Sequence, residues 1–125
     1  MPASYRELKV WQESMLLVKE VYKFIDNLPE KERFALAEQM RRSAISVPSN
    51  VAEGQGRGSD KDFARFVYIA KGSLCELETQ LELCIMLGYF SREQLNSLFD
   101  LAAEIGKKIN NLIKKLTISD NVKFG

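Results

Sequence analysis

The sequence contains no histidine among its 125 residues. This absence excludes Ser-His-Asp and Cys-His catalytic arrangements, histidine metal sites and the Glu-x-x-His pairs of di-iron helical bundles. Cysteine is nearly as scarce, because Cys75 and Cys84 are the only two, and both fall within one helical pattern. A disulfide between them would bend that helix, so we expect two reduced cysteines in the core and a cytoplasmic protein.

Long apolar runs are lacking as well. The chain begins without the apolar segment of a signal peptide, and no run approaches the roughly 20 apolar residues of a membrane span, so no membrane association is expected. No stretch alternates between polar and apolar residues with period two, and therefore no sheet is predicted. Internal repeats and low-complexity segments are also absent from the sequence.

The residues that are present fit an ordinary globular domain. Apolar residues make up 46% and charged residues 28% of the chain, and the length suits one domain, residues 1–125. The net charge is +1, from 18 basic and 17 acidic side chains. This balance excludes a uniformly basic nucleic-acid coat and leaves room for a local basic patch.

Apolar residues recur at steps of three and four in four segments, about 6–28, 30–53, 60–87 and 92–116. Pro29 suits a helix start, while Ser59 and Ser91 resemble the capping serines of the third and fourth helices. Four such helices joined by short turns bury their stripes best as an all-α, antiparallel, up-down-up-down four-helix bundle. Residues 117–125 have little periodicity and are expected to form a loose tail.

The third helix is unusually apolar at its start, "FARFVYIA" in residues 63–70. This stretch covers more of the helix surface than a single buried stripe requires. One interpretation is a deeply buried helix, and the other is a subunit interface. The residues predicted for that interface are Phe63, Phe66, Val67, Tyr68 and Ile69.

The glycine cluster in residues 54–59, "GQGRGS", is not a phosphate-binding loop. It follows a helix instead of a strand, it lacks the final glycine of a dinucleotide fingerprint, and it has no Gly-Lys-Ser or Gly-Lys-Thr. A structural role is therefore predicted for Pro48, Asn50, Glu53 and Gly54. Pro48 should kink the second helix, Gly54 should end it in a left-handed conformation, and Asn50 and Glu53 should bond to backbone N–H groups or to Arg57.

Positive charge is concentrated in two segments. Residues 41–71 carry six basic and three acidic side chains, and residues 107–125 carry five and one. In an antiparallel bundle these segments should meet at one pole, which either stays solvated, pairs subunits, or contacts RNA or DNA. The residues predicted for this basic pole are Arg41, Arg42, Arg57, Lys61, Arg65, Lys107, Lys108, Lys114 and Lys115.

Catalytic groups are few. Glu76, Glu78 and Glu82 are available carboxylates on the third helix, but Glu78 and Glu82 fit a solvated helix face. We therefore expect no enzyme activity, no cofactor and no bound metal.

One stretch resembles a known family. The residues that carry the resemblance are "RRS" at 41–43, "SVP" at 46–48, "NVAEG" at 50–54, Arg57, "GS" at 72–73 and "ELE" at 76–78. Over residues 8–116 the chain resembles the bacterial four-helix bundle proteins encoded in intervening sequences of 23S ribosomal RNA genes. Relatives of that family include the accessory variability determinant of diversity-generating retroelements, which works with nucleic acid and a reverse transcriptase.

The resemblance implies a left-handed bundle and a homopentamer. Together with the basic pole, it leads to the hypothesis of a non-enzymatic homo-oligomer that binds RNA or another nucleic acid. The alternative is a structural scaffold or adaptor with no nucleic-acid role, whose protein partner the sequence does not name.

Overall fold

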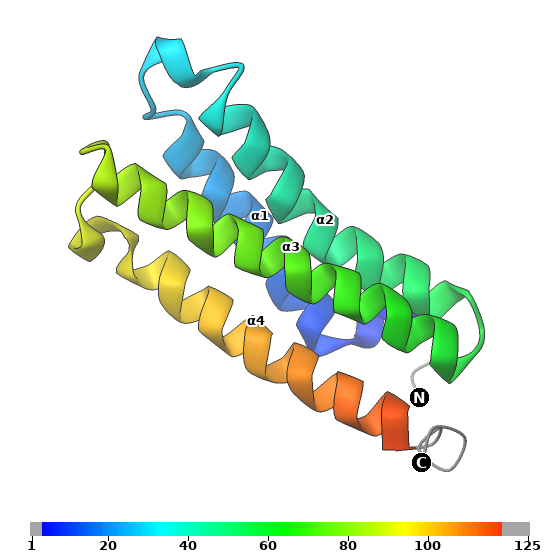
Figure 1. The fold of residues 1–125 in the computed structure, drawn as a ribbon. Coiled ribbons are helices and arrows are strands. Elements are labelled where there is room, and N and C mark those ends of the chain that lie inside the picture. Colours follow the sequence, from blue (N-terminus) through cyan, green and yellow to red (C-terminus); the bar gives the residue numbers. More distant parts are fainter. Residues whose placement is uncertain (1–3, 119–125) are drawn as a thin grey trace.

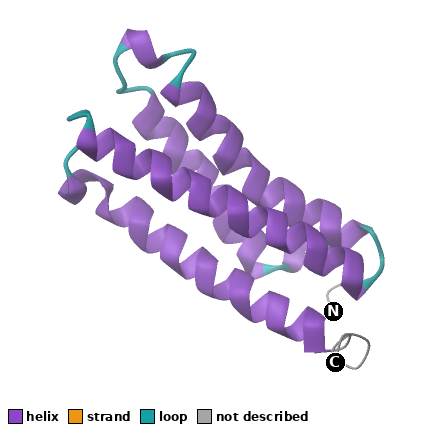
Figure 2. Ribbon diagram, viewed as in Figure 1, coloured by secondary structure: helices purple, strands orange, loops and turns teal. Residues whose placement is uncertain are grey.

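The computed structural model describes residues 4–118 and consists of helices joined by short connections (Figure 1). No residue within 4–118 belongs to a strand, as Figure 2 shows, and the prediction of an all-α four-helix bundle is confirmed. The left-handed sense of the bundle stays a prediction. The elements are the short 3-10 helices η1 (Tyr5–Glu7) and η2 (Glu30–Glu32) and the α-helices α1 (Lys9–Ile25), α2 (Leu36–Gly56), α3 (Asp60–Met86) and α4 (Arg92–Ile118).

Consecutive α-helices run in opposite directions (Figure 1). At one end, which we call the η2 end, the Tyr89 hydroxyl donates a hydrogen bond of 2.6 Å to Glu32, and the rings of Phe24 and Phe90 lie 5.4 Å apart. At the other end, which we call the α2–α3 end, the α2–α3 turn lies beside the start of α1 and the end of α4 (Figure 1). Each end of the bundle therefore brings together segments that are far apart in the sequence.

The core follows the apolar periodicity of the sequence, most regularly in α4. Leu95, Leu98, Ile105 and Ile109 are all buried, and they join one continuous cluster with the apolar stripes of the other three helices. The predicted caps are also present. Ser59 Oγ accepts the Asp62 N–H at 3.1 Å, while Ser91 and Gln94 bond to each other's backbone N–H groups at 3.1 and 2.8 Å.

The second helix begins later than predicted, at Leu36 instead of residue 30. Between η2 and α2 the only large apolar residue is Phe34, which is 83% exposed, so a longer helix would have had no stripe to bury. The Glu32 side chain accepts both the Tyr89 hydroxyl and the Leu36 N–H. The first helix likewise ends at Ile25, three residues before its predicted end.

The predicted role of Gly54 is wrong. α2 continues through Gly54 to Gly56, and the positive φ angle that the turn requires belongs to Gly58, at 87°. Gly54 serves close packing, because a Cβ atom there would lie 2.7 Å from the Cβ of Phe66. The backbones of α2 and α3 therefore lie close together at Gly54.

The other three residues of the predicted structural motif behave differently from one another. Pro48 is buried inside α2, which continues past it. Asn50 donates its amide to the Ser46 carbonyl at 2.8 Å instead of accepting a backbone N–H, so that prediction is wrong. Glu53 pairs with Arg57 at 2.6 Å, as expected.

The apolar start of α3 divides between core and surface. Phe63, Phe66 and Val67 are 4, 7 and 0% exposed, so they are buried within the single chain and are not available as interface residues. Tyr68 and Ile69 are 53 and 44% exposed. The predicted interface is thus reduced to these two residues.

The two cysteines are both free, and the prediction that both lie in the core is wrong for one of them, because Cys84 is buried but Cys75 is exposed. Burial raises the pKa of the Cys84 thiol to about 11, and the negative charge of Glu32 adds to this. Since the thiolate is the reactive form, Cys75 should be alkylated by iodoacetamide at about pH 8 while Cys84 reacts only after unfolding. Mass spectrometry of the peptides checks this, and equal labelling of both residues in the native protein would contradict it.

Candidate nucleic-acid interface

The structure separates two arginines from the predicted basic pole. Arg41 lies in the second turn of α2, near the η2 end, and a helix rise of about 1.5 Å per residue places it roughly 24 Å along the axis from Arg57. Arg41 and Arg42 therefore belong to the opposite end of the bundle from the other seven residues. The prediction of a nine-residue basic pole is wrong for these two.

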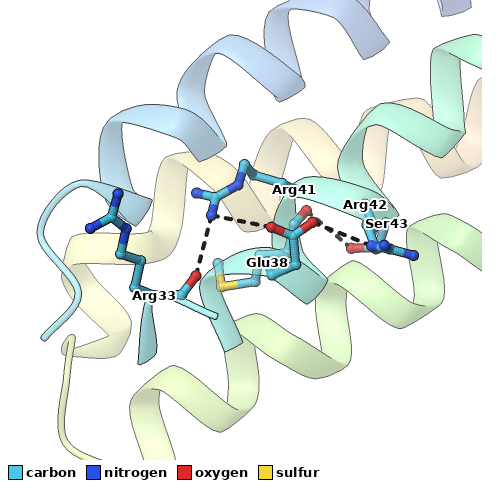
Figure 3. Close-up of polar contacts among 6 residues, drawn as sticks. Arg33, Glu38, Arg41, Arg42 and Ser43 are labelled. Carbon is cyan, nitrogen blue, oxygen red and sulfur yellow. Dashed lines mark hydrogen bonds and ion pairs between the residues drawn. The ribbon is translucent and has the colours of Figure 1, made fainter. Parts of the chain in front are cut away.

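Local partners occupy both of these arginines, as Figure 3 shows. The Arg41 guanidinium donates to the Arg33 carbonyl at 3.3 Å and pairs with Glu38 at 3.5 Å. Arg42 pairs with the other oxygen of the same Glu38 carboxylate at 3.3 Å. One carboxylate thus partly balances two guanidinium groups, and this cluster joins the first turns of α2 to the η2–α2 connection.

The other seven predicted residues do share the α2–α3 end. Arg57 follows the last residue of α2, Lys61 and Arg65 lie in the first two turns of α3, and the four lysines lie in the last turns of α4. The antiparallel arrangement of the helices brings these segments to one end (Figure 1). The four lysines are Lys107, Lys108, Lys114 and Lys115.

The arginines at this end are held locally. Arg57 pairs with Glu53 at 2.6 Å and Arg65 with Asp62 at 3.7 Å, and both guanidinium carbons lie within 5 Å of the centre of the Phe66 ring. Such exposed ion pairs contribute little to stability, but they reduce the net charge that a ligand would meet. Stacking on Phe66 fixes the position of both side chains.

The excess positive charge at the α2–α3 end comes from α4. The parts of α1, α2 and α3 at this end, residues 5–13, 47–57 and 60–70, contain two, one and two basic side chains against two, one and two acidic ones. Residues 107–118 contain four lysines and no acidic residue, so the net charge of this end is nine minus five, or +4. The negative end of the α4 dipole favours lysines there, which accounts for part of the enrichment.

Three of the four α4 lysines have no ion pair with any residue in the described part of the chain. Lys107, Lys114 and Lys115 are exposed, whereas Lys108 pairs with Glu13 of α1 at 3.0 Å. We call Lys107, Lys114 and Lys115 the lysine face. A cationic surface without internal counter-charges is the feature that binding to a polyanion requires.

A groove adjoins the lysine face between the start of α1 and the end of α4. It is an open groove of about 250 Å³, and one of its lysines, Lys9, is not among the residues predicted for the basic pole. The signal was weak, because Lys9 belongs to a segment whose charges balance, and only the contact between α1 and α4 brings it near the α4 lysines. The lining residues are Leu8, Lys9, Val10, Lys108, Asn111, Leu112 and Lys115.

The candidate carboxylates do not form a site. Glu82 accepts two hydrogen bonds from Arg92, at 2.6 and 3.2 Å, which lower the pKa of the Glu82 carboxyl, while burial raises the pKa of Glu78. Residues 4–118 contain no group of three or more cysteine, aspartate or glutamate side chains placed to hold a metal ion.

None of the described helices combines the length and apolar character needed to cross a membrane.

Comparison with known proteins agrees with the resemblance seen in the sequence. The family model of the 23S rRNA-intervening sequence proteins matches residues 6–111. A solved structure from Bacteroides thetaiotaomicron VPI-5482, of a protein of unknown function from the S23 ribosomal protein family, is 29% identical and has a TM-score of 0.77. That match covers 84% of this chain and 95% of the other. No curated protein matches the chain.

Proposed function

The chain belongs to the 23S rRNA-intervening sequence protein family, and we propose that it is a non-enzymatic, homo-oligomeric bundle that binds RNA through the lysine face. The observation that carries the proposal is the exposure of Lys107, Lys114 and Lys115 without ion-pair partners among the described residues. A nucleic-acid role would be shared with the accessory proteins of diversity-generating retroelements, which the resemblance to the family gives as relatives.

The spacing of these lysines suits a phosphate backbone. Lys107 and Lys114 are seven residues apart, so they lie on one line along α4 and span about 10.5 Å, and Lys115 lies beside Lys114 on the same helix. The three ammonium groups can therefore contact phosphates of one strand. Each contact releases condensed counterions, which makes the binding strongly dependent on salt.

A fluorescence anisotropy titration with labelled RNA tests the proposal. If three to four phosphates of a single strand are contacted, the logarithm of the association constant should fall with the logarithm of salt concentration with a slope of about −2 to −3. Absence of binding even at low salt would overturn the RNA role. If the protein assembles but does not bind RNA, the alternative of a structural scaffold or adaptor is favoured.

Self-association is proposed through the exposed apolar residues of α3, with the pentamer that the resemblance implies. Light scattering should then give about five times the chain mass of 14.3 kDa. Replacing Tyr68 and Ile69 with glutamate should reduce this mass, because a charge buried at an interface is costly. Glutamate at Met15 and Leu16 of α1, which are 46 and 45% exposed, is the matched control. A wild-type monomer at micromolar concentration would contradict the assembly.

A further inference from the structure

We infer that the groove between α1 and α4 binds single-stranded RNA, with its lysines on the phosphates and its apolar floor beneath an unstacked base. This inference rests on the proposed RNA binding and adds the form of RNA that is recognised. It is carried by the combination, in one groove, of three lysines, an asparagine and an apolar floor.

The floor of the groove is formed by three aliphatic side chains. Val10 and Leu112 belong to the core and are 5 and 9% exposed, and Leu8, which is half-buried, precedes the first turn of α1. These side chains are fixed by the packing of α1 against α4. An apolar surface in a groove of about 250 Å³ can therefore cover a flat ring without rearrangement of the core.

The rim of the groove is cationic. Lys9 comes from α1, and Lys108 and Lys115 come from α4, one on each side of Asn111. Glu13 balances the charge of Lys108, so the groove carries a net charge of three minus one, or +2. A purely apolar ligand would leave the Lys9 and Lys115 side chains without a counter-charge from the ligand, and an inorganic anion would leave the floor uncovered.

An RNA single strand satisfies both parts of the groove. In a duplex the bases are stacked inside the helix, and only phosphates, hydroxyls and base edges are presented to a protein. In a single strand the bases can be turned outward onto an apolar surface while the phosphates remain beside the lysines. The amide of Asn111 offers both a donor and an acceptor, which can bond to the edge of such a base.

The groove also adjoins the lysine face, because Lys115 belongs to both. A strand whose phosphates contact Lys107 and Lys114 can therefore continue across Lys115 into the groove. The lysine face supplies sequence-independent attraction, and the groove supplies a preference for unpaired bases.

The test compares three oligonucleotides of equal length on the full chain: a single-stranded RNA, the same RNA as a duplex, and an abasic strand with the same phosphates. The single strand should bind at least about fivefold more tightly than the abasic strand, because covering the face of one base with aliphatic side chains removes enough apolar surface from water for an effect of that size. It should also bind more tightly than the duplex. Cross-links from 4-thiouridine RNA should map to the peptides that contain Lys9 or Asn111.

A floor variant distinguishes the groove from the lysines. Leu8→Asn removes an apolar side chain, keeps the charge, and places a favourable capping residue at the position before α1. It should abolish the preference for the single strand over the abasic strand, whereas Leu16→Asn, at an exposed leucine of α1, should not.

The possible results separate the two proposals. Equal affinity for the single strand and the abasic strand, or tighter binding of the duplex, overturns the groove inference and leaves RNA binding by the lysine face intact. Cross-links confined to residues outside the groove overturn it as well. Failure of all three oligonucleotides to bind at low salt overturns the proposed function itself.

Discussion

Replacing Gly54 with alanine should lower the free energy of unfolding by about 2 to 3 kcal/mol, as overpacking of a tight contact does. The new Cβ atom would lie 2.7 Å from the Cβ of Phe66 and 3.2 Å from the Phe63 carbonyl oxygen. Neither atom can move by a side-chain rotation, because one is fixed to the backbone of α3 and the other is part of it. The two helices would have to separate at this point.

Gly72→Ala is the matched control. Gly72 lies in the middle of α3, and apart from the adjoining backbone of its own helix, no atom of the described residues lies within 4 Å of the position that its Cβ would take. Alanine there should raise the free energy of unfolding by about 0.5 to 1 kcal/mol, since glycine costs more backbone entropy inside a helix. Urea denaturation followed by circular dichroism, at one protein concentration, measures both variants. If Gly54→Ala also raised the free energy of unfolding, the close approach of α2 and α3 would not depend on glycine at this position.

The close approach at Gly54 is part of a longer contact between α2 and α3. Further along the two helices, the hydroxyls of Ser46 and Ser73 lie 2.7 Å apart, and Ser43 donates to Gln80 at 2.6 Å. Small side chains and direct polar bonds allow two helix backbones to lie near each other and fix their register. Ser43, Ser46 and Ser73 belong to the residues that carry the family resemblance, and their role is therefore to join α2 to α3.

The helices could be predicted where periodicity alone decides, as in α4, whose buried residues alternate at steps of three and four. The start of α2 could not, because it depends on Glu32 being bound by Tyr89, which lies 57 residues further along the chain. The role of Gly54 likewise depends on Phe66 in the next helix, a contact that local sequence does not reveal.

The candidate site was predicted in part. The basic residues of 41–71 are close in sequence, but α2 is about 30 Å long. Arg41 and Arg57 therefore lie at opposite ends of the bundle, and the prediction that both belong to one basic pole is wrong. The four α4 lysines could be predicted because they lie together in one short segment, residues 107–125, with five basic residues and one acidic residue. Lys9 was missed because its proximity to Lys108 and Lys115 arises from tertiary structure.

Replacing Lys107, Lys114 and Lys115 with glutamate should weaken RNA binding on the order of 100-fold at about 0.1 M salt, because three phosphate contacts are lost and three repulsions are added. The salt dependence should decrease as well, by about 2 in slope, since each lost contact with a single strand removes about 0.7. Anisotropy titrations over a range of salt concentrations measure both quantities. The change in slope distinguishes lost phosphate contacts from a general loss of folded protein.

The control variant carries the same charge at the other end of the bundle. Glutamate at Lys19, Lys23 and Lys31, in α1 and η2, also leaves 15 basic and 20 acidic side chains, a net charge of −5. If binding depends only on net charge, both variants will lose affinity equally, and the lysine face is then not the interface. If the lysine face binds the phosphates, the control will keep most of the affinity and the full salt slope.

Glutamate near the end of α4 also opposes the helix dipole and can cost about 0.3 to 1 kcal/mol of stability per site. A third variant with glutamine at Lys107, Lys114 and Lys115 avoids this repulsion and still removes the three charges. It should lose less affinity than the glutamate variant but show the same decrease in salt slope, because the number of phosphate contacts is equal in both. A glutamine variant with the wild-type slope would mean that these three lysines do not contact the phosphates, whatever the glutamate variant does.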